Sequence, residues 1–403
     1  MSSAPRVTIV TSRLDIGGAE RHLARVLPAL KRRGIDVTLY AMERDGPLEV
    51  ELMLGGVRVE GPRRGSVLHW PRATLKLAGF LRRERPTVVH FFLPRPYIYG
   101  SIAAELVGHR RRLMSRRSLT VYREKYPLLG SVERLLHGRT HGLIGNSRPV
   151  LEQLAAEISD RSKLALIHNG IEIPPLATLA DRQRVRQSLN IESDALVVVV
   201  VANLVDYKGH RDLVDALGLA KDQLPRPWHM LAIGRDEGIG AELRQQAESL
   251  NVAANIKWIG EQRAVEQLLV AGDICVLPSH QEGFSNALLE AMAANLAIIA
   301  TAVGGNLDAI VDNDSGILVR PRDPRALATA LMRLAADPAL RSRLAAAARC
   351  RVEQRFTLEN CVDRYEKLYR AMNERDPRPV ADVLAVDESA VCPQPPLTPE
   401  YAR

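Results

Sequence analysis

The stretch 274–292 constrains the fold more than any other part of this chain. It begins with four apolar residues typical of a buried strand, and Pro278 and Gly283 then interrupt the pattern. It continues as an apolar helix that Ser285 or Asn286 can cap. A strand, a loop and a helix in this order form the building unit of parallel α/β folds, so we expect a parallel sheet covered by helices.

The unit recurs immediately downstream. The apolar run over 297–303 predicts a second buried strand, and Gly304 and Gly305 follow it before another helix begins. An unbroken apolar run over 195–202 predicts a further buried strand of the same sheet. Loops that follow parallel strands open at one edge of the sheet, so we expect the loops after 277 and 303 to lie side by side.

The loop within 274–292 has the composition of an anion site. Free N–H groups at a helix N-terminus attract a phosphate. The groups concerned belong to Gly283, Phe284, Ser285 and Asn286. Glu282 in the loop and Glu290 in the helix lie roughly 12 Å apart along a helix axis, so we expect them to hold different parts of one ligand. The alternative is an ordinary helix cap with two solvated glutamates.

These residues resemble a known family. The run from Glu282 to Glu290 reads E-G-F-S-N-A-L-L-E and resembles the E-x7-E motif of the retaining GT-B glycosyltransferases of family four. The run V-G-G-N-L-D over 303–308 is similar to that family's second donor loop, V-G-G-x-x-E. The resemblance extends to about residue 372 with its motifs in the expected order. It implies an α/β GT-B fold, in which two Rossmann-like domains face each other across a cleft.

The resemblance also implies a domain organisation. A polar stretch with prolines over 172–190 suggests the interdomain linker. The expected segments are an acceptor-side domain over 1–175, a nucleotide-sugar-binding domain over 190–356, a closing helix over 357–372 that returns to the first domain, and a disordered tail over 373–403.

The first domain should begin with a strand, a loop and a helix. Gly17 and Gly18 stand at the entrance of the helix predicted over 19–33, without a G-x-G-x-x-G pattern. The resemblance implies that this glycine loop faces the donor phosphates and the acceptor; the alternative is a tight turn. His90 ends a predicted strand and is a candidate substrate contact, or else a packed core histidine.

Positive charge is concentrated in the first half. Residues 1–180 contain 29 Lys and Arg against 16 Asp and Glu, and the remainder contains 26 against 31. The densest cluster, over 109–118, suggests a lipid-phosphate acceptor or peripheral contact with an anionic membrane; the alternative is an ordinary solvated face. No base-stacking motif accompanies it, which disfavours nucleic acid. Many family members have a sugar-contacting histidine in this region, where this chain has Ser115, Arg116 and Arg117.

Lys208 is the candidate cation of the second domain. The run over 203–210 resembles the family's G-R-L-x-x-x-K-G loop, which implies that Lys208 pairs with the donor diphosphate. Asn203 occupies the usual arginine position, so we expect Arg235 or a basic residue of the first domain to replace that charge. The alternative for Lys208 is a surface lysine at a helix start.

Cysteine usage and hydropathy point to the cytoplasm. The four cysteines show no metal-binding spacing, and Cys275 lies within a predicted strand, which suggests reduced thiols. The N-terminus has no signal-peptide core, and no uncharged apolar run reaches about 18 residues. We expect a cytoplasmic protein, with contact at the inner face of the membrane as an option.

The resemblance implies transfer of a hexosyl or related group (EC 2.4 class) from a nucleotide diphosphate sugar to a saccharide or lipid-linked acceptor. Retention at the anomeric carbon, a role in cell-envelope polysaccharide or glycolipid synthesis, and no metal or other cofactor are implied as well. Glu282 and Lys208 would act in catalysis, and Glu290 would hold the ribose hydroxyls. Two alternatives stay open: a non-catalytic GT-B protein that binds nucleotide sugar or envelope lipid, and a sugar-nucleotide epimerase.

Overall fold

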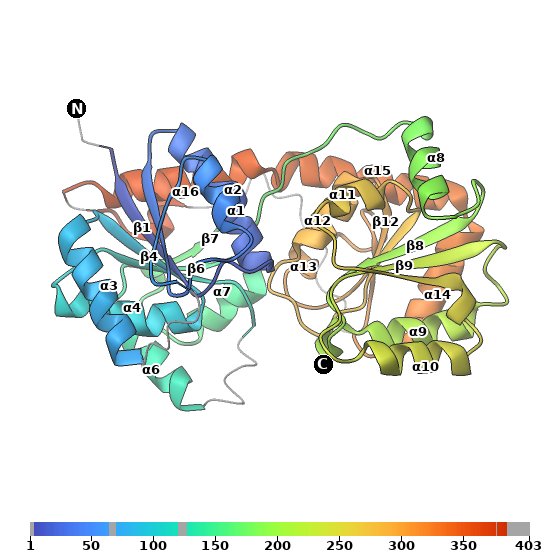
Figure 1. Ribbon diagram of the computed structural model, residues 1–403, viewed down its shortest axis with the longest axis horizontal. Helices are drawn as coiled ribbons and strands as arrows, with labels where there is room; N and C mark the ends of the chain where they lie inside the picture. The colour runs from blue at the N-terminus through green and yellow to red at the C-terminus, as the bar shows by residue number, and fades with distance from the viewer. Residues whose placement is uncertain (1–3, 64–69, 120–126, 376, 385–403) are drawn as a thin grey trace. The chain divides into compact units, whose positions relative to one another are not determined.

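The computed structural model describes residues 4–63, 70–119, 127–375 and 377–384, and they form two compact units (Figure 1). Among the described residues, those up to 170 and those over 358–384 belong to unit 1, and those over 171–357 belong to unit 2. Each unit has its own parallel sheet with helices on both faces. The predicted α/β class with two Rossmann-like halves is therefore confirmed.

The sheet of unit 1 has seven parallel strands in the order β3-β2-β1-β4-β5-β6-β7. The strand order reverses between β1 and β4, which are hydrogen-bonded neighbours. Such a switch point is where the loops at the carboxyl edge separate and leave room for a ligand. The strands are β1 (Arg6–Thr11), β2 (Asp36–Ala41), β3 (Arg58–Glu60), β4 (Val88–Phe92), β5 (Arg112–Arg116), β6 (Gly142–Gly145) and β7 (Leu164–Leu166).

Two apolar cores cover the faces of this sheet. One lies under α1, α2 and α16, and the other lies under α3 and α4. The helices of unit 1 are α1 (Gly18–Arg32), α2 (Glu49–Leu54), α3 (Trp70–Glu84), α4 (Pro94–Leu106), α6 (Pro127–His137), α7 (Arg148–Ala155), η1 (Arg161–Lys163), α16 (Leu358–Met372) and α17 (Val380–Val383).

The sheet of unit 2 has six parallel strands in the order β10-β9-β8-β11-β12-β13. Its switch point lies between β8 and β11, which pair directly. The predicted strands over 195–202, 274–277 and 297–303 are the three central strands, as expected for runs that are apolar on both faces. The strands are β8 (Leu196–Val201), β9 (Trp228–Ile233), β10 (Ile256–Gly260), β11 (Ile274–Leu277), β12 (Ala297–Thr301) and β13 (Ile317–Val319).

Strand β8 is apolar throughout because its side chains pack into a separate core on each face of the sheet. Val198 and Val200 belong to the core beneath α9, α10 and α14. Val197 and Val199 point to the opposite face and join the core beneath α11, α12 and α15. The helices of unit 2 are α8 (Leu179–Ser188), η2 (Asp206–Lys208), α9 (His210–Ala220), α10 (Gly240–Ser249), η3 (Ala253–Asn255), α11 (Val265–Leu269), α12 (Asn286–Ala293), α13 (Asn306–Ala309), α14 (Pro324–Ala336) and α15 (Pro338–Arg355).

The segment predicted as the interdomain linker contains helix α8. Thr178 and Asp181 form a capping box at its start, since each side chain accepts a hydrogen bond from the other residue's N–H. Arg186 on this helix is buried and donates to Asp273, at 2.9 Å, within unit 2. Helix α8 is therefore anchored to unit 2, which the polar composition of the segment concealed.

The ordered chain also extends further than predicted at its C-terminal end. The expectation of a disordered tail from residue 373 is wrong for 377–384, where α17 forms and contacts β7 and α16. Val380 and Leu384 are 1% and 4% exposed, and both join the core of unit 1. Two buried apolar side chains fix this segment despite its polar composition. Residues 385–403 of the predicted tail lie outside the described residues.

The longest helix, α15, has 18 residues and contains several arginines. Within the described ranges, no helix is both long enough and apolar enough to cross a membrane.

Candidate functional site

Two loops meet at the switch point of unit 2, one after β8 and one after β11. Gly209 has a left-handed backbone with φ of 70°, and a Cβ atom added there would lie 1.9 Å from the carbonyl oxygen of Pro278. The N–H of His280 donates to the carbonyl of Tyr207 at 2.7 Å. The imidazole of His280 pairs with Asp212 of α9, also at 2.7 Å. The loop that carries Lys208 is thus fixed against the loop that carries Glu282.

The third loop, after β12, lies against the second as the sequence predicted. The N–H of Gly305 donates to the carbonyl of Gly283 at 2.9 Å. A Cβ atom on Gly304, whose φ is 47°, would lie 1.8 Å from the carbonyl oxygen of Glu282. Close backbone contact therefore explains both glycines, whose predicted role was to border the bound ligand.

Lys208 and Glu282 form an ion pair in which Nζ and Oε1 are 2.6 Å apart. The hydroxyl of Ser279 donates to the same carboxylate oxygen at 2.8 Å. The two charged side chains are 19% and 10% exposed, so water screens them only partly. Burial disfavours the ammonium form of Lys208, but the attraction and hydrogen bond of Glu282 prevail and raise the pKa of Lys208. Lys208 is therefore a protonated cation at neutral pH.

Helix α12 begins beside this pair. Ser285 is its N-cap, and the Ser285 hydroxyl accepts a hydrogen bond from the N–H of Leu288 at 3.2 Å. Phe284 anchors the preceding loop, because its ring packs against Phe356 at a centroid distance of 5.2 Å. Asn286 is the first helical residue and Glu290 lies one turn further along. The start of the helix, a partly buried cation and two carboxylates thus lie at one edge of the sheet.

Replacing Ser285 with alanine is expected to lower the free energy of unfolding of unit 2 by about 1 kcal/mol, because the helix loses its capping hydroxyl. Urea unfolding followed by tryptophan fluorescence measures this change. Ser249→Ala is the matched control, since the Ser249 hydroxyl is exposed at the end of α10 and donates only to the Gln246 carbonyl. Equal stability of the two variants would contradict the capping role.

Asn203 occupies the position of the missing arginine and organises a neighbouring turn. Its side-chain oxygen accepts from the N–H of Arg235 at 3.2 Å, and its amide donates to Glu237 at 2.7 Å. The guanidinium of Arg235 is 48% exposed and pairs with Glu237 at 2.8 Å, with Glu261 further away at 3.9 Å. Arg235 therefore lies at the correct edge of the sheet, but two carboxylates offset its charge.

Several contacts at this site were missed in the sequence. They are the hydroxyl of Ser279 on Glu282, the carboxylate of Glu237 between Asn203 and Arg235, and the His280 and Asp212 pair. Ser279 lies three residues before Glu282, but nothing in the sequence signalled a hydrogen bond between them. The contacts of Asn203 with Glu237 and of His280 with Asp212 join residues that are 34 and 68 positions apart, and no local pattern signals them.

The glycines predicted for unit 1 lie at the start of α1. Gly17 is the N-cap residue, and a Cβ atom on it would lie 2.4 Å from the carboxylate of Glu20. Gly18 has open space where its Cβ would be. Burial raises the pKa of Glu20, against the lowering effect of its own backbone N–H and of Arg117. Gly17 thus makes room for the Glu20 carboxylate, and no observation assigns either glycine to a ligand.

His90 is a core residue, and its position does not support the predicted substrate contact. Its side chain is fully buried, and its two ring nitrogens bond the hydroxyls of Tyr369 and Ser115 at 2.8 and 2.9 Å. Burial, with the nearby charge of Arg117, lowers the pKa of His90 to about 3. His90 therefore stays neutral and connects α16 to the sheet.

Arg117 is the cation at the carboxyl end of β5, in the region of the missing histidine. Its guanidinium donates to the side-chain oxygen of Asn169 and lies 5.8 Å from the centre of the Phe92 ring. It also bonds the Tyr365 hydroxyl, and burial lowers the pKa of the guanidinium, although not enough to discharge it. The sequence signalled this residue through the basic cluster over 109–118 and through its place at the position of the missing histidine, but not through its contacts.

Comparison with known proteins gives matches to two families. Residues 181–351 match the family described as "Glycosyl transferases group 1", and residues 16–173 match "Glycosyltransferase Family 4". Together these matches span most of the chain, one in each unit.

Individual relatives share this similarity. The chain is 28% identical to a D-inositol 3-phosphate glycosyltransferase of Actinosynnema mirum, over 82% of this chain and 87% of that protein. It is 26% identical to the lipopolysaccharide core biosynthesis glycosyltransferase LpsE of Rhizobium meliloti, over 87% of this chain and 95% of that protein. A crystal structure of Anabaena HepE in complex with UDP-glucose superimposes with a TM-score of 0.79 at 20% identity, covering 89% of this chain and 97% of that one.

Proposed function

This chain belongs to the group 1 glycosyltransferases, and from that premise we propose that it transfers a sugar from a nucleotide diphosphate sugar to an acceptor hydroxyl with retention. The observation that carries the proposal is the partly buried Lys208 and Glu282 pair beside the start of α12, at the switch point of unit 2. A partly buried cation next to the N-terminus of a helix favours a diphosphate. Both lie where open α/β sheets bind their ligands.

Each polar group has a distinct role in this proposal. The Lys208 ammonium, held in position by Glu282, contacts the donor diphosphate, and the N–H groups of residues 283–286 add donors on the same side. Glu282 then accepts a hydrogen bond from a hydroxyl of the sugar, while Glu290 accepts from the ribose hydroxyls. Lys208 stabilises the negative charge that grows on the diphosphate as it departs.

The proposed reaction is a front-face displacement. The bond between the anomeric carbon and the diphosphate oxygen breaks, and the acceptor oxygen bonds to the same face of that carbon. The proton of the acceptor hydroxyl passes to the departing diphosphate. Glu282 is a poor candidate for a covalent nucleophile, because one of its oxygens already accepts hydrogen bonds from Lys208 and Ser279. A glycosyl adduct trapped on Glu282 would contradict this mechanism, and anomeric inversion in the product would contradict retention.

The proposed acceptor is a saccharide or lipid-linked hydroxyl of the cell envelope. Support comes from relatives such as LpsE, which is named for lipopolysaccharide core biosynthesis, and from the excess of basic residues in the first half of the chain. The competing proposal, a non-catalytic protein that binds nucleotide sugar, is favoured by Asn203 in place of the arginine. The product of a turnover assay separates the two proposals.

The experiment that tests the donor site is a calorimetric titration with UDP, GDP, ADP and dTDP. We expect one of them to bind with micromolar affinity, and Glu290→Ala to weaken that binding about tenfold to a hundredfold, because hydrogen bonds to a carboxylate are lost. Glu248→Ala is the control, since Glu248 is an exposed glutamate on α10. If no nucleotide binds, or if Glu290→Ala binds as well as the parent protein, the donor-site assignment is wrong.

A further inference from the structure

Unit 1 contains a pocket of about 680 Å³ at the amino ends of its strands. Its lining includes Arg112, the first residue of β5, together with His141 and Lys163, which directly precede β6 and β7. In a parallel sheet the amino ends lie opposite the carboxyl ends, and five-residue β5 separates these edges by roughly 17 Å. The pocket is therefore separate from the edge where Gly17 and Arg117 lie.

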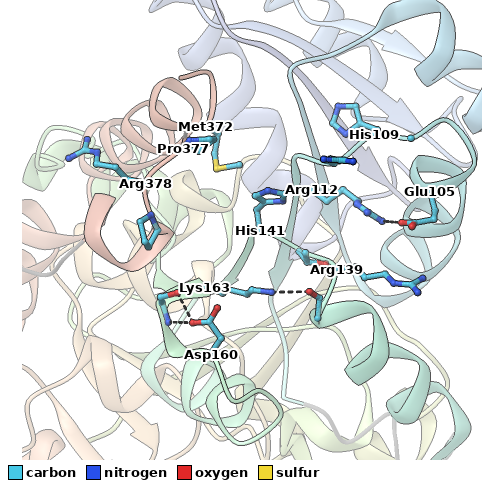
Figure 2. A pocket seen from close by; sticks show the side chains of 16 residues that line it. Glu105, His109, Arg112, Arg139, His141, Asp160, Lys163, Met372, Pro377 and Arg378 are labelled. Atoms are coloured by element: carbon cyan, nitrogen blue, oxygen red, sulfur yellow. Dashed lines mark hydrogen bonds and ion pairs between the residues drawn. The ribbon is translucent and has the colours of Figure 1, made fainter. Parts of the chain in front are cut away.

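The lining of this pocket is strongly basic (Figure 2). Glu105 and Asp160 are its two acids. Figure 2 shows His141 between Arg112 and Lys163, with Arg139 and Arg378 at opposite sides. The basic lining residues are Arg110, Arg112, Arg139, Lys163, Arg378, His109 and His141.

The two acids do not neutralise this charge. Glu105 pairs with Arg112 at 2.6 Å, and Asp160 accepts from the N–H of Ser162 at 3.1 Å. Lys163 donates to the Gly138 carbonyl at 3.0 Å, a contact that leaves its charge uncompensated. Among the residues that the structure describes, Arg110, Arg139 and Arg378 form no ion pair. The pocket thus has an excess of cations.

Two buried nitrogen atoms of the lining also have no hydrogen-bond partner in the described structure. They are Nε of Arg112, whose side chain is 8% exposed, and Nδ1 of His109. The Arg112 Nε always carries a proton, and an unpaired buried donor is costly unless a ligand or water accepts from it. Burial and the neighbouring cations lower the pKa values of His109 and His141, consistent with positive potential in the pocket.

We propose that this pocket is a second ligand site of the protein and binds a small soluble molecule that carries several phosphate groups. Arginine and lysine side chains from separate elements surround it, and such side chains recognise phosphate oxygens through charge-assisted hydrogen bonds. Its volume lies within the range of small-molecule sites. The described residues that line it include no Phe, Tyr or Trp, so the lining favours a polyphosphate or a phosphorylated polyol over a nucleotide that needs stacking.

The test uses inorganic tripolyphosphate in a calorimetric titration of the full-length Lys208→Ala protein, which removes the phosphate-binding cation of unit 2. We expect one binding event per chain. Adding Arg110→Gln and Arg139→Gln should weaken it at least tenfold. The control adds Arg72→Gln and Arg82→Gln, which remove the same charge from exposed positions on α3 of the same unit, and should change the affinity less than twofold.

Each result decides the proposal. The proposal is supported if tripolyphosphate binding is lost only when Arg110→Gln and Arg139→Gln are added. It is overturned if the control pair weakens binding equally, or if the Lys208→Ala protein itself does not bind tripolyphosphate. Sedimentation with vesicles of phosphatidylglycerol distinguishes the source of the phosphate. If the protein binds vesicles but not tripolyphosphate, and Arg110→Gln with Arg139→Gln abolishes the vesicle binding, the proposal of a soluble ligand is wrong and the pocket binds a lipid headgroup. The result is independent of donor binding, since Lys208 is absent from every protein in the series.

Discussion

Replacing Lys208 with alanine is expected to lower the turnover number about 100-fold to 1000-fold, the usual effect of removing one preorganised donor to a developing negative charge. The ammonium is 19% exposed and Glu282 holds it 2.6 Å away, so its position is fixed before the ligand binds. Nucleotide affinity should fall as well, because the diphosphate loses its cation. Single-turnover kinetics with the nucleotide sugar identified by calorimetry separate the two effects.

Two further variants control this experiment. Lys257→Ala removes a lysine from strand β10 of the same unit, and it should keep the parent turnover. Lys208→Arg keeps the charge but changes its shape, so we expect it to retain part of the nucleotide affinity. Far-ultraviolet circular dichroism and urea unfolding show whether Lys208→Ala remains folded with Glu282 unpaired. A folded Lys208→Ala protein with parent turnover would rule out the proposed role.

Gly209→Ala is expected to destabilise unit 2 by about 2 to 5 kcal/mol. A left-handed backbone costs a residue with a Cβ atom about 1 to 2 kcal/mol, and overpacking adds about 1 to 3 kcal/mol. The added methyl group would lie 1.9 Å from the Pro278 carbonyl oxygen, so one of two backbone segments must move. Nucleotide affinity should fall too, because this contact fixes the Lys208 loop.

Gly260→Ala is a closely matched control for this change. Gly260 has a φ of 78°, close to the 70° of Gly209, but nothing lies within 4 Å of where its Cβ would be. It should therefore show only the backbone cost, about 1 to 2 kcal/mol, and keep its nucleotide affinity. Urea unfolding followed by the fluorescence of Trp228 and Trp258 measures both variants. Equal losses would show that the contact with Pro278 contributes nothing.

The sheets and the meeting of the loops were predictable because their signals are local. Strands β8, β11 and β12 are apolar on both faces. A short run of this kind is typical of a strand that is covered on both sides in a parallel sheet. Parallel order then places the loops after β11 and β12 at one edge. The contact of Gly304 and Gly305 with residues 282 and 283 follows from this geometry.

The contacts that define the site depend on long-range packing, and the sequence could not predict them. Lys208 and Glu282 are 74 positions apart, and two residues that each attract a ligand need not attract each other. His90 resembled a ligand contact because the sequence placed it at the end of a strand, but it lies in the middle of β4 and its partner Tyr369 is 279 positions away. Helix α17 was missed because two apolar anchors in a polar segment leave no periodic pattern.

The return of α16 to unit 1 has a consequence for protein synthesis. Tyr365, Leu368 and Tyr369 are at most 1% exposed and complete the core under α1, so the first unit lacks part of its interior until they leave the ribosome. At roughly 5 to 20 residues per second, the 279 positions between His90 and Tyr369 take roughly 15 to 60 seconds to translate. The second unit, continuous in sequence over 171–357, is complete before the first. Throughout that interval the nascent first unit lacks these three side chains, and the apolar surface that they cover in the folded protein stays uncovered.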